Sequence, residues 1–264
     1  MSDDSSSGPG AAKGTKELGG VKAAFLSLVS VSGIYFVLPV VAALLVYWVV
    51  GVFLGWPHAR IVTWLNESIS AQFFYMTLAQ IFTLGAIYFL LRRFGWTLRT
   101  IGLTRPKWHN FLTGVVATVP YLVLYVILIR VVTALVPGFD VDQRQEIGFE
   151  NASTTLQLAM TFVSLVILPP IVEEITMRGF LYTGLRKWLP RVLAAILVSG
   201  LFGAAHLAEG GDVGPLWIGA LDTFALSLVL ISLREITGNL WAGITLHMLK
   251  NGVAFVILFT SFVR

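Results

Sequence analysis

The segment LPPIVEEITMRGF, residues 168–180, places two adjacent glutamates and an arginine at the end of a strongly apolar run. An ionisable side chain inside a bilayer costs several kcal/mol unless it faces a partner or a water-filled cavity, and such groups usually mark function. Glu173 and Glu174 therefore predict a polar site enclosed by membrane-spanning helices.

The composition indicates a membrane protein. Of the 264 residues, 56% are hydrophobic and 12% are charged, which lies outside the range of soluble globular domains. The chain has no cysteine, which excludes disulfides, thiolate metal sites and a cysteine nucleophile. The net charge of +4 is modest, and we expect the lipid bilayer, and no nucleic acid, as a partner of this chain.

Seven apolar runs have roughly the length that a helix needs to cross a bilayer. They cover residues 25–54, 71–91, 110–136, 154–175, 191–208, 215–234 and 240–261. The first run would supply an eighth span if it were broken, and it lacks the early small-residue cleavage site of a secretory signal. The sequence therefore predicts an all-α fold, a polytopic transmembrane helical bundle of seven to eight spans.

The chain divides into three predicted parts. Residues 1–21 are rich in Ser, Gly and Asp and are expected to form a disordered cytoplasmic tail. Residues 22–150 supply the N-terminal transmembrane helices. Residues 151–264 contain the acidic pair and form the second helical part.

Basic connections alternate with acidic or mixed ones along the chain. One side of a seven-span arrangement carries Lys13, Lys16, Lys22, Arg92, Arg93, Arg99, Arg105, Lys107, Arg186, Lys187, Arg191 and Arg234. The other side carries His58, Arg60, Glu67, Asp140, Asp142, Arg144, Glu146, Glu150, Glu209 and Asp212. Because basic connections stay in the cytoplasm, we expect a cytoplasmic N-terminus and an external C-terminus. The expected location of the protein is a bacterial or archaeal cytoplasmic membrane.

The spacing within the acidic segment separates the two glutamates. Glu174 and Arg178 are four residues apart on one helical face and are expected to pair, whereas Glu173 lies about 100° around the helix. Two carboxylates this close cannot both ionise cheaply in a low dielectric, so Arg178 holds one of them as the anion. Glu174 is thus predicted to be structural, and Glu173 is predicted to be available for chemistry.

A histidine on the next helix falls at the same predicted depth as the free glutamate. Glu173 lies 17 residues before Pro190 and His206 lies 16 residues after it, so two helical arms would bring their side chains close together. His206 ends the run FGAAH, whose small residues allow a neighbouring helix to approach closely.

The last span carries a further polar pair. His247 and Asn251 are four residues apart on one helical face. Lys250 and Asp222 are additional charged residues in spans, and the simplest explanation for them is a mutual ion pair or the lining of a cavity. Three separate helices thus present polar groups toward the interior.

Three motifs in this order resemble the signature of a protease family. They are Glu173-Glu174-x-x-x-Arg178, Phe202-x-x-x-His206 and His247-x-x-x-Asn251. They are similar to those of the CPBP family of intramembrane proteases, also called the Abi family, which includes the CAAX prenyl endopeptidases. The resemblance covers about residues 155–256 and makes residues 151–264 the expected catalytic core. It implies an intramembrane endopeptidase that hydrolyses a peptide bond of a membrane-associated substrate, prenylated or C-terminally tagged, without a covalent intermediate.

In this scheme each motif residue has its own role in hydrolysis. Glu173 would take a proton from water, and His206 would orient that water or share the role of base. His247 and Asn251 would donate hydrogen bonds to the developing oxyanion.

Glu174 and Arg178 would hold this geometry. A zinc ion is the alternative, because Glu173, His206 and His247 form a known type of ligand set with a fourth position open to water. The metal-free scheme is favoured, because the chain has no His-Glu-x-x-His spacing and an asparagine is a poor zinc ligand.

Other classes of membrane protein also place polar residues at mid-membrane. A transporter and a non-catalytic immunity or scaffold protein are the alternatives. No inverted repeat is visible, because residues 25–136 contain no counterpart of the acidic or histidine motifs. Since the Glu173 helix continues to the basic residues Arg186 and Lys187, we expect the cavity to open toward the cytoplasm. The sequence indicates no oligomeric state.

Overall fold

The computed structural model describes residues 19–149 and 151–259, and within these ranges it consists of helices and loops without a strand. The predicted tail of residues 1–21 lies almost entirely outside the described residues. In chain order the elements are α1 (Gly20–Leu54), α2 (His58–Glu67), α3 (Ile69–Phe94), α4 (Trp108–Val116), α5 (Thr118–Leu135), α6 (Thr155–Phe162), η1 (Val163–Ile167), α7 (Leu168–Glu173), η2 (Glu174–Leu181), α8 (Tyr182–Arg186), α9 (Arg191–Ala205), η3 (His206–Val213), α10 (Trp217–Thr237) and α11 (Trp241–Phe259).

The all-α transmembrane fold predicted from the sequence is confirmed. In the described part of the chain, 7 helices are long and apolar enough to cross a membrane. They are α1, α3, α4 with α5, the run from α6 to α8, α9 with most of η3, α10 and α11. The first apolar run is one helix that continues past Pro39, so the described residues contain no eighth span.

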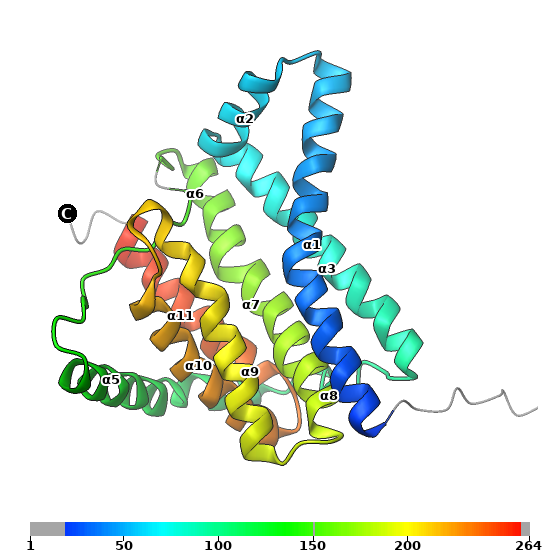
Figure 1. Ribbon diagram of the computed structural model, residues 1–264, viewed down its shortest axis with the longest axis vertical. Coiled ribbons are helices and arrows are strands. Elements are labelled where there is room, and N and C mark those ends of the chain that lie inside the picture. Colours follow the sequence, from blue (N-terminus) through cyan, green and yellow to red (C-terminus); the bar gives the residue numbers. More distant parts are fainter. Residues whose placement is uncertain (1–18, 150, 260–264) are drawn as a thin grey trace, which may run out of the picture.

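One short helix was not anticipated. The amphipathic helix α2 follows Pro57 and joins the upper ends of α1 and α3 (Figure 1). Its Ile61 side chain is buried, while Trp64 packs edge-on against Trp56 and Arg60 lies over the Trp56 ring. The helix is too short and too polar to span a membrane, and aromatic residues of this kind are typical of the membrane interface.

The helix that carries the glutamates contains two wider, π-helical turns. The first, η1, directly precedes Pro169 and Pro170. A proline lacks the amide hydrogen of a helical turn and its ring clashes with the carbonyl four residues earlier, so the helix must open locally. The second, η2, begins at Glu174 and includes Arg178. Turns of this type occur mostly at functional sites.

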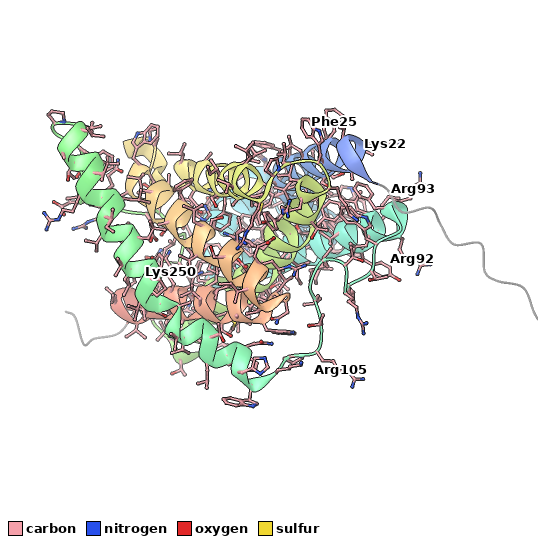
Figure 2. The ribbon with its side chains drawn as sticks, turned by 90° about the horizontal axis from the view of Figure 1, so that it is seen from below. Lys22, Phe25, Arg92, Arg93, Arg105 and Lys250 are labelled. Carbon is pink, nitrogen blue, oxygen red and sulfur yellow. The ribbon has the colours of Figure 1, made fainter. Side chains whose placement is uncertain are left out.

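Helices α4 and α5 cross the bundle instead of running alongside its other helices (Figures 1 and 2). The helix α4 packs against α11, and α5 packs against α10. The contact with α11 is close because Gly114 has no side chain: a Cβ there would lie 2.5 Å from the carbonyl oxygen of Ala242. The 110–136 run is therefore a helix as predicted, although its direction was not evident from the sequence.

The hairpin of α9 and α10 depends on a similar close approach. Gly203 is buried, and a Cβ at this position would lie 2.7 Å from the carbonyl oxygen of Ala220 on α10. The small residues that precede His206 thus allow the approach that the sequence predicted. They fix the distance between α9, which ends at the histidine, and α10.

Replacing Gly203 with Ala should force α9 away from α10, because the added methyl group would overlap a backbone oxygen that cannot rotate away. We expect the Gly203→Ala variant to lose about 1–3 kcal/mol of stability. Thermal unfolding in detergent, followed by circular dichroism, would measure the loss.

Gly200→Ala on the same helix is the matched control, because nothing lies within 4 Å of a Cβ at that position. It should match the unsubstituted protein or gain up to about 1 kcal/mol from the helix propensity of alanine. An equal loss of stability in the two variants would contradict the role given to Gly203.

Candidate active site

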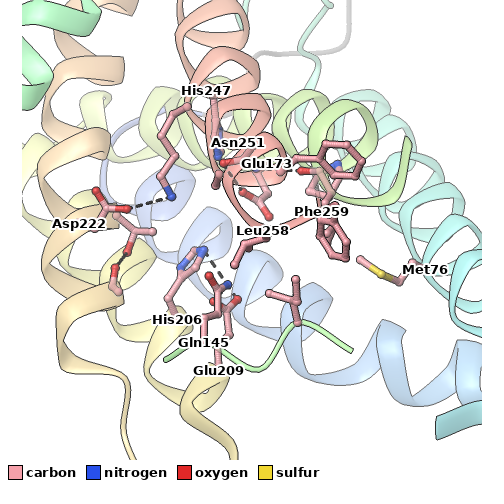
Figure 3. A pocket seen from close by; sticks show the side chains of 18 of the residues that line it. Met76, Gln145, Glu173, His206, Glu209, Asp222, His247, Asn251, Leu258 and Phe259 are labelled. Carbon is pink, nitrogen blue, oxygen red and sulfur yellow. Dashed lines mark hydrogen bonds and ion pairs between the residues drawn. The ribbon is translucent and has the colours of Figure 1, made fainter. Parts of the chain in front are cut away.

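A cavity of about 210 Å³ contains the residues that the sequence singled out for chemistry (Figure 3). Its polar wall includes Glu173, His206, His247 and Asn251. The other lining residues are Met76, Gln80, Gln145, Ile147, Leu165, Pro169, Glu209, Gly219, Asp222, Thr223, Lys250, Ala254, Phe255, Leu258 and Phe259. The three motifs, which lie far apart in sequence, therefore meet around one space.

The second glutamate and the arginine form a buried ion pair behind the cavity wall. Arg178 Nη1 donates to Glu174 Oε1 at 2.8 Å, and both residues are fully buried. The Arg178 guanidinium also lies over the Phe202 ring, with its carbon 4.1 Å from the ring centroid. A buried carboxylate requires such a partner. The pairing expected from the four-residue spacing is present.

His247 lies between the two carboxylates. Its Nδ1 is 3.3 Å from Glu174 Oε1, and its Nε2 is 3.7 Å from Glu173 Oε2. The same Glu174 oxygen accepts from Arg178, and a carboxylate in an ion pair accepts hydrogen bonds, so the geometry suits an Nδ1–H donor on His247. This contact fixes the ring and directs Nε2 toward Glu173 and the cavity.

Glu173 is the more accessible of the two glutamates. Its side chain is 21% exposed and forms part of the cavity wall, whereas Glu174 is enclosed. On its other side, a smaller space is bordered by Tyr35 of α1 and by Gln80 of α3. The structure thus separates the acidic pair in the way that the helical spacing predicted.

His206 lines the same cavity from the end of α9. Its Nδ1 lies 2.7 Å from the carbonyl oxygen of Phe202, which accepts the hydrogen bond and leaves Nε2 facing Glu209 Oε1 at 3.9 Å. The Phe202 ring packs edge-on against His206 as well. Glu173 and His206 therefore share one cavity, but the imidazole that lies directly beside Glu173 is that of His247.

Asn251 completes the polar wall and also forms a hydrogen bond with the backbone of the helix opposite. Its Nδ2 donates to the carbonyl oxygen of Leu165 at 2.9 Å. In a regular helix this carbonyl would accept from residue 169, but Pro169 has no amide hydrogen. The asparagine therefore satisfies a backbone group freed by the proline, and its second amide hydrogen remains for a ligand in the cavity.

The two extra charged residues pair with each other on the cavity wall. Lys250 Nζ lies 2.9 Å from Asp222 Oδ2, and the Tyr121 hydroxyl of α5 donates to Asp222 Oδ1. The mutual pair was anticipated from the sequence. The tyrosine was not, because it lies 101 residues before its partner with no spacing that links them.

Sequence reasoning also missed the polar contacts at the cavity's end. Gln145 Nε2 donates to Glu209 Oε2 at 2.7 Å, and the Glu146 amide donates to the Glu209 carbonyl oxygen at 2.8 Å. These bonds tie the described part of the connection after α5, residues 136–149, to η3. Glu209 follows His206 by three residues, and this helical spacing was the one signal in the sequence that could have identified it.

The proposed zinc ligands do not converge. Within residues 19–149 and 151–259, no three histidine, aspartate or glutamate side chains are grouped so that they could hold a metal ion. Glu173, His206 and His247 share the cavity, but the nearest carboxylate to His206 Nε2 belongs to Glu209. The donor set in this arrangement does not fit a tetrahedral zinc site.

The cavity does not extend toward Arg186 and Lys187, the end of the bundle at which we expected it to open. The chain beyond Glu173, toward Arg186, is closed, because all residues of η2 are buried and Phe180 packs against Phe94 and Trp96. The cavity extends the opposite way, toward exposed Gln145 and the end of α11. Continuity of the helix toward the basic residues did not imply an opening there.

Comparison with known proteins gives a family match in the C-terminal part of the chain. Residues 155–253 match a sequence model of the family described as "Type II CAAX prenyl endopeptidase Rce1-like", which confirms the resemblance drawn from the motifs. The matched region contains all seven residues that define the three motifs. Searches of the curated proteins and of the solved structures each give no match.

Removing one member of the Asp222–Lys250 pair should destabilise the protein. Lys250→Met leaves the Asp222 carboxylate, whose side chain is 17% exposed, with the Tyr121 hydroxyl alone. We expect a loss of about 1–3 kcal/mol, less than for a fully enclosed pair. Thermal unfolding in detergent would measure it.

The double variant Lys250→Met/Asp222→Asn removes both charges and should recover most of this loss. If the single and double variants were equally unstable, the ion pair would not be the source of the effect.

Proposed function

We propose, on the premise that residues 155–253 match the type II CAAX prenyl endopeptidases, that this protein is an intramembrane endopeptidase in which Glu173 activates water. The observation that carries the proposal is the separation of the two glutamates. Glu174 is neutralised by Arg178, whereas Glu173 is accessible and lies beside His247 in a cavity. The substrate is a peptide segment of a membrane-associated protein.

In the first step, a Glu173 oxygen takes a proton from water as the water oxygen attacks the scissile carbonyl carbon. His206 supports this step, because its Nδ1–H is committed to Phe202 and its Nε2 can accept a hydrogen bond from the water. The product is a tetrahedral intermediate with a negative oxygen.

His247 and Asn251 stabilise that negative oxygen. Asn251 has one amide hydrogen bound to Leu165 and a second one for the oxyanion. A donor role for His247 requires a proton on Nε2 as well as on Nδ1, and Glu173 and Glu174 lie on either side of such a cation. Transfer of the proton from Glu173 to the leaving amine then breaks the C–N bond without a covalent enzyme intermediate.

Glu173→Gln should abolish cleavage while the fold is kept. The amide cannot take a proton, and loss of a general base lowers rates by about 10²- to 10⁴-fold. We would compare protein termini by proteomics in cells that contain the unsubstituted protein or the variant, and confirm equal unfolding temperatures after purification. If the protein termini were the same in cells with the unsubstituted protein and in cells with the variant, the proposed endopeptidase function would be contradicted.

The same experiment separates the other candidate functions. A transporter or a scaffold generates no new termini, so cells with and without the protein would then have identical profiles. For a zinc enzyme, a strong chelator would silence the purified protein, added zinc would restore cleavage and zinc would bind stoichiometrically. In the glutamate scheme, the chelator leaves the rate unchanged.

We expect a partial loss of the cleavage rate when the space beside the Glu174 side chain is filled. A Cβ at Gly243 would lie 2.8 Å from Glu174 Oε2, so Gly243→Ala should displace the carboxylate that orients His247. Small displacements of positioned groups lower rates by up to about 10²-fold, and we expect a loss of about 10- to 100-fold.

Gly252→Ala on the same helix is the control, because its Cβ would make only an ordinary 3.6 Å contact with Val166. Cleavage rates measured on a substrate found by the proteomic comparison should fall for Gly243→Ala alone. Equal rates for these two variants and the unsubstituted protein would show that the position of Glu174 does not control the reaction.

A further inference from the structure

All elements around the cavity contribute to it from the same end of the bundle. Helices α3 and α10 contribute residues from their first halves, η3 contributes His206 and Glu209 directly after the end of α9, and α11 contributes residues from His247 to its C-terminal end. Because these neighbours run in opposite directions, their contributing halves coincide in space. In Figure 1 this is the upper end, where α2, the start of α6 and the end of α11 lie.

This end is also where the cavity meets the surface. Leu258 and Gln145 line the cavity and are exposed. Gln145 belongs to the described part of the connection after α5, residues 136–149, which lies along one side of the opening and is held to η3 through Glu209. At the other end of the bundle, Phe94, Trp96 and Phe180 form a buried aromatic cluster below the acidic motif.

The two ends differ strongly in charge. The closed end carries Lys22, Arg92, Arg93, Arg99, Arg105, Lys107, Arg186, Lys187, Arg191 and Arg234. Figure 2 shows Lys22, Arg92, Arg93 and Arg105 projecting outward there. The open end and its connections carry Arg60, Glu67, Asp140, Asp142, Arg144, Glu146 and Glu209. Basic residues near the ends of spans are retained in the cytoplasm, whereas acidic residues have little effect on orientation.

We propose that the cavity opens on the extracytoplasmic face of the membrane and receives a segment of an exported, membrane-anchored polypeptide. This inference rests on the proposed peptidase function and specifies its substrate class. A protein that carries its lipid or its tag on the cytoplasmic face would meet the closed, basic end. Water for hydrolysis enters from the outer side, through the same opening as the substrate.

The absence of cysteine from the sequence provides a clean test. Single cysteines would be placed at Asp142, an exposed residue of the connection beside the opening, and at Arg105, an exposed residue of the basic end. Cells of a bacterial host that produce each variant would be treated with a membrane-impermeant sulfonated maleimide, before and after lysis. We expect Asp142→Cys to react in intact cells and Arg105→Cys to react only after lysis.

The reverse pattern, or reaction of Asp142→Cys only after lysis, would overturn the inference. The proteomic comparison gives an independent readout: termini that depend on Glu173 should map to the outer side of the substrates' spans. Glu173-dependent termini on cytoplasmic segments would refute substrate entry from the outer face, but they would still support the peptidase function. If Asp142→Cys reacted in intact cells but no termini depended on Glu173, the peptidase function would be refuted, and the outward opening of the cavity would not.

Discussion

The buried ion pair of Glu174 and Arg178 is the interaction on which the candidate site depends. Losing one partner of such a pair costs about 3–5 kcal/mol, because the other charge remains enclosed. Each neighbouring element contributes to holding it: Phe202 of α9 lies against the guanidinium, His247 of α11 contacts the carboxylate, and Gly243 leaves space for it. The pair therefore positions the two histidine-bearing motifs relative to the free glutamate.

A backbone constraint places the third motif in the same way. Pro169 leaves the carbonyl group of Leu165 without its helical partner, in a part of the protein where an unsatisfied carbonyl costs several kcal/mol. Asn251 supplies the missing donor from α11. This bond holds α11 against η1, and it directs the rest of the amide into the cavity. A residue proposed for chemistry thus also serves the fold, so its loss affects both.

Sequence spacing predicted the spans, the Glu174–Arg178 pair and the gathering of three motifs, because each rests on local helical geometry or on hydropathy. It did not predict which histidine lies beside Glu173. Counting from Pro190 gives the depth of His206, but the direction of a side chain around the axis depends on every turn between, and η2 contains a wider one. Contacts such as Tyr121 with Asp222 join distant residues that no periodicity relates.

The direction of the cavity follows from where large apolar side chains pack, which hydropathy alone does not reveal. On one side of Glu173 the eight residues of η2 are buried, and aromatic rings fill the space between helices. On the other side, polar residues and the small Ala254 line the cavity together with larger apolar side chains. The proposed peptidase function needs this asymmetry: water must reach Glu173 from one face, while the opposite face stays sealed so that the membrane does not leak protons or ions. The basic end of the bundle is the sealed one.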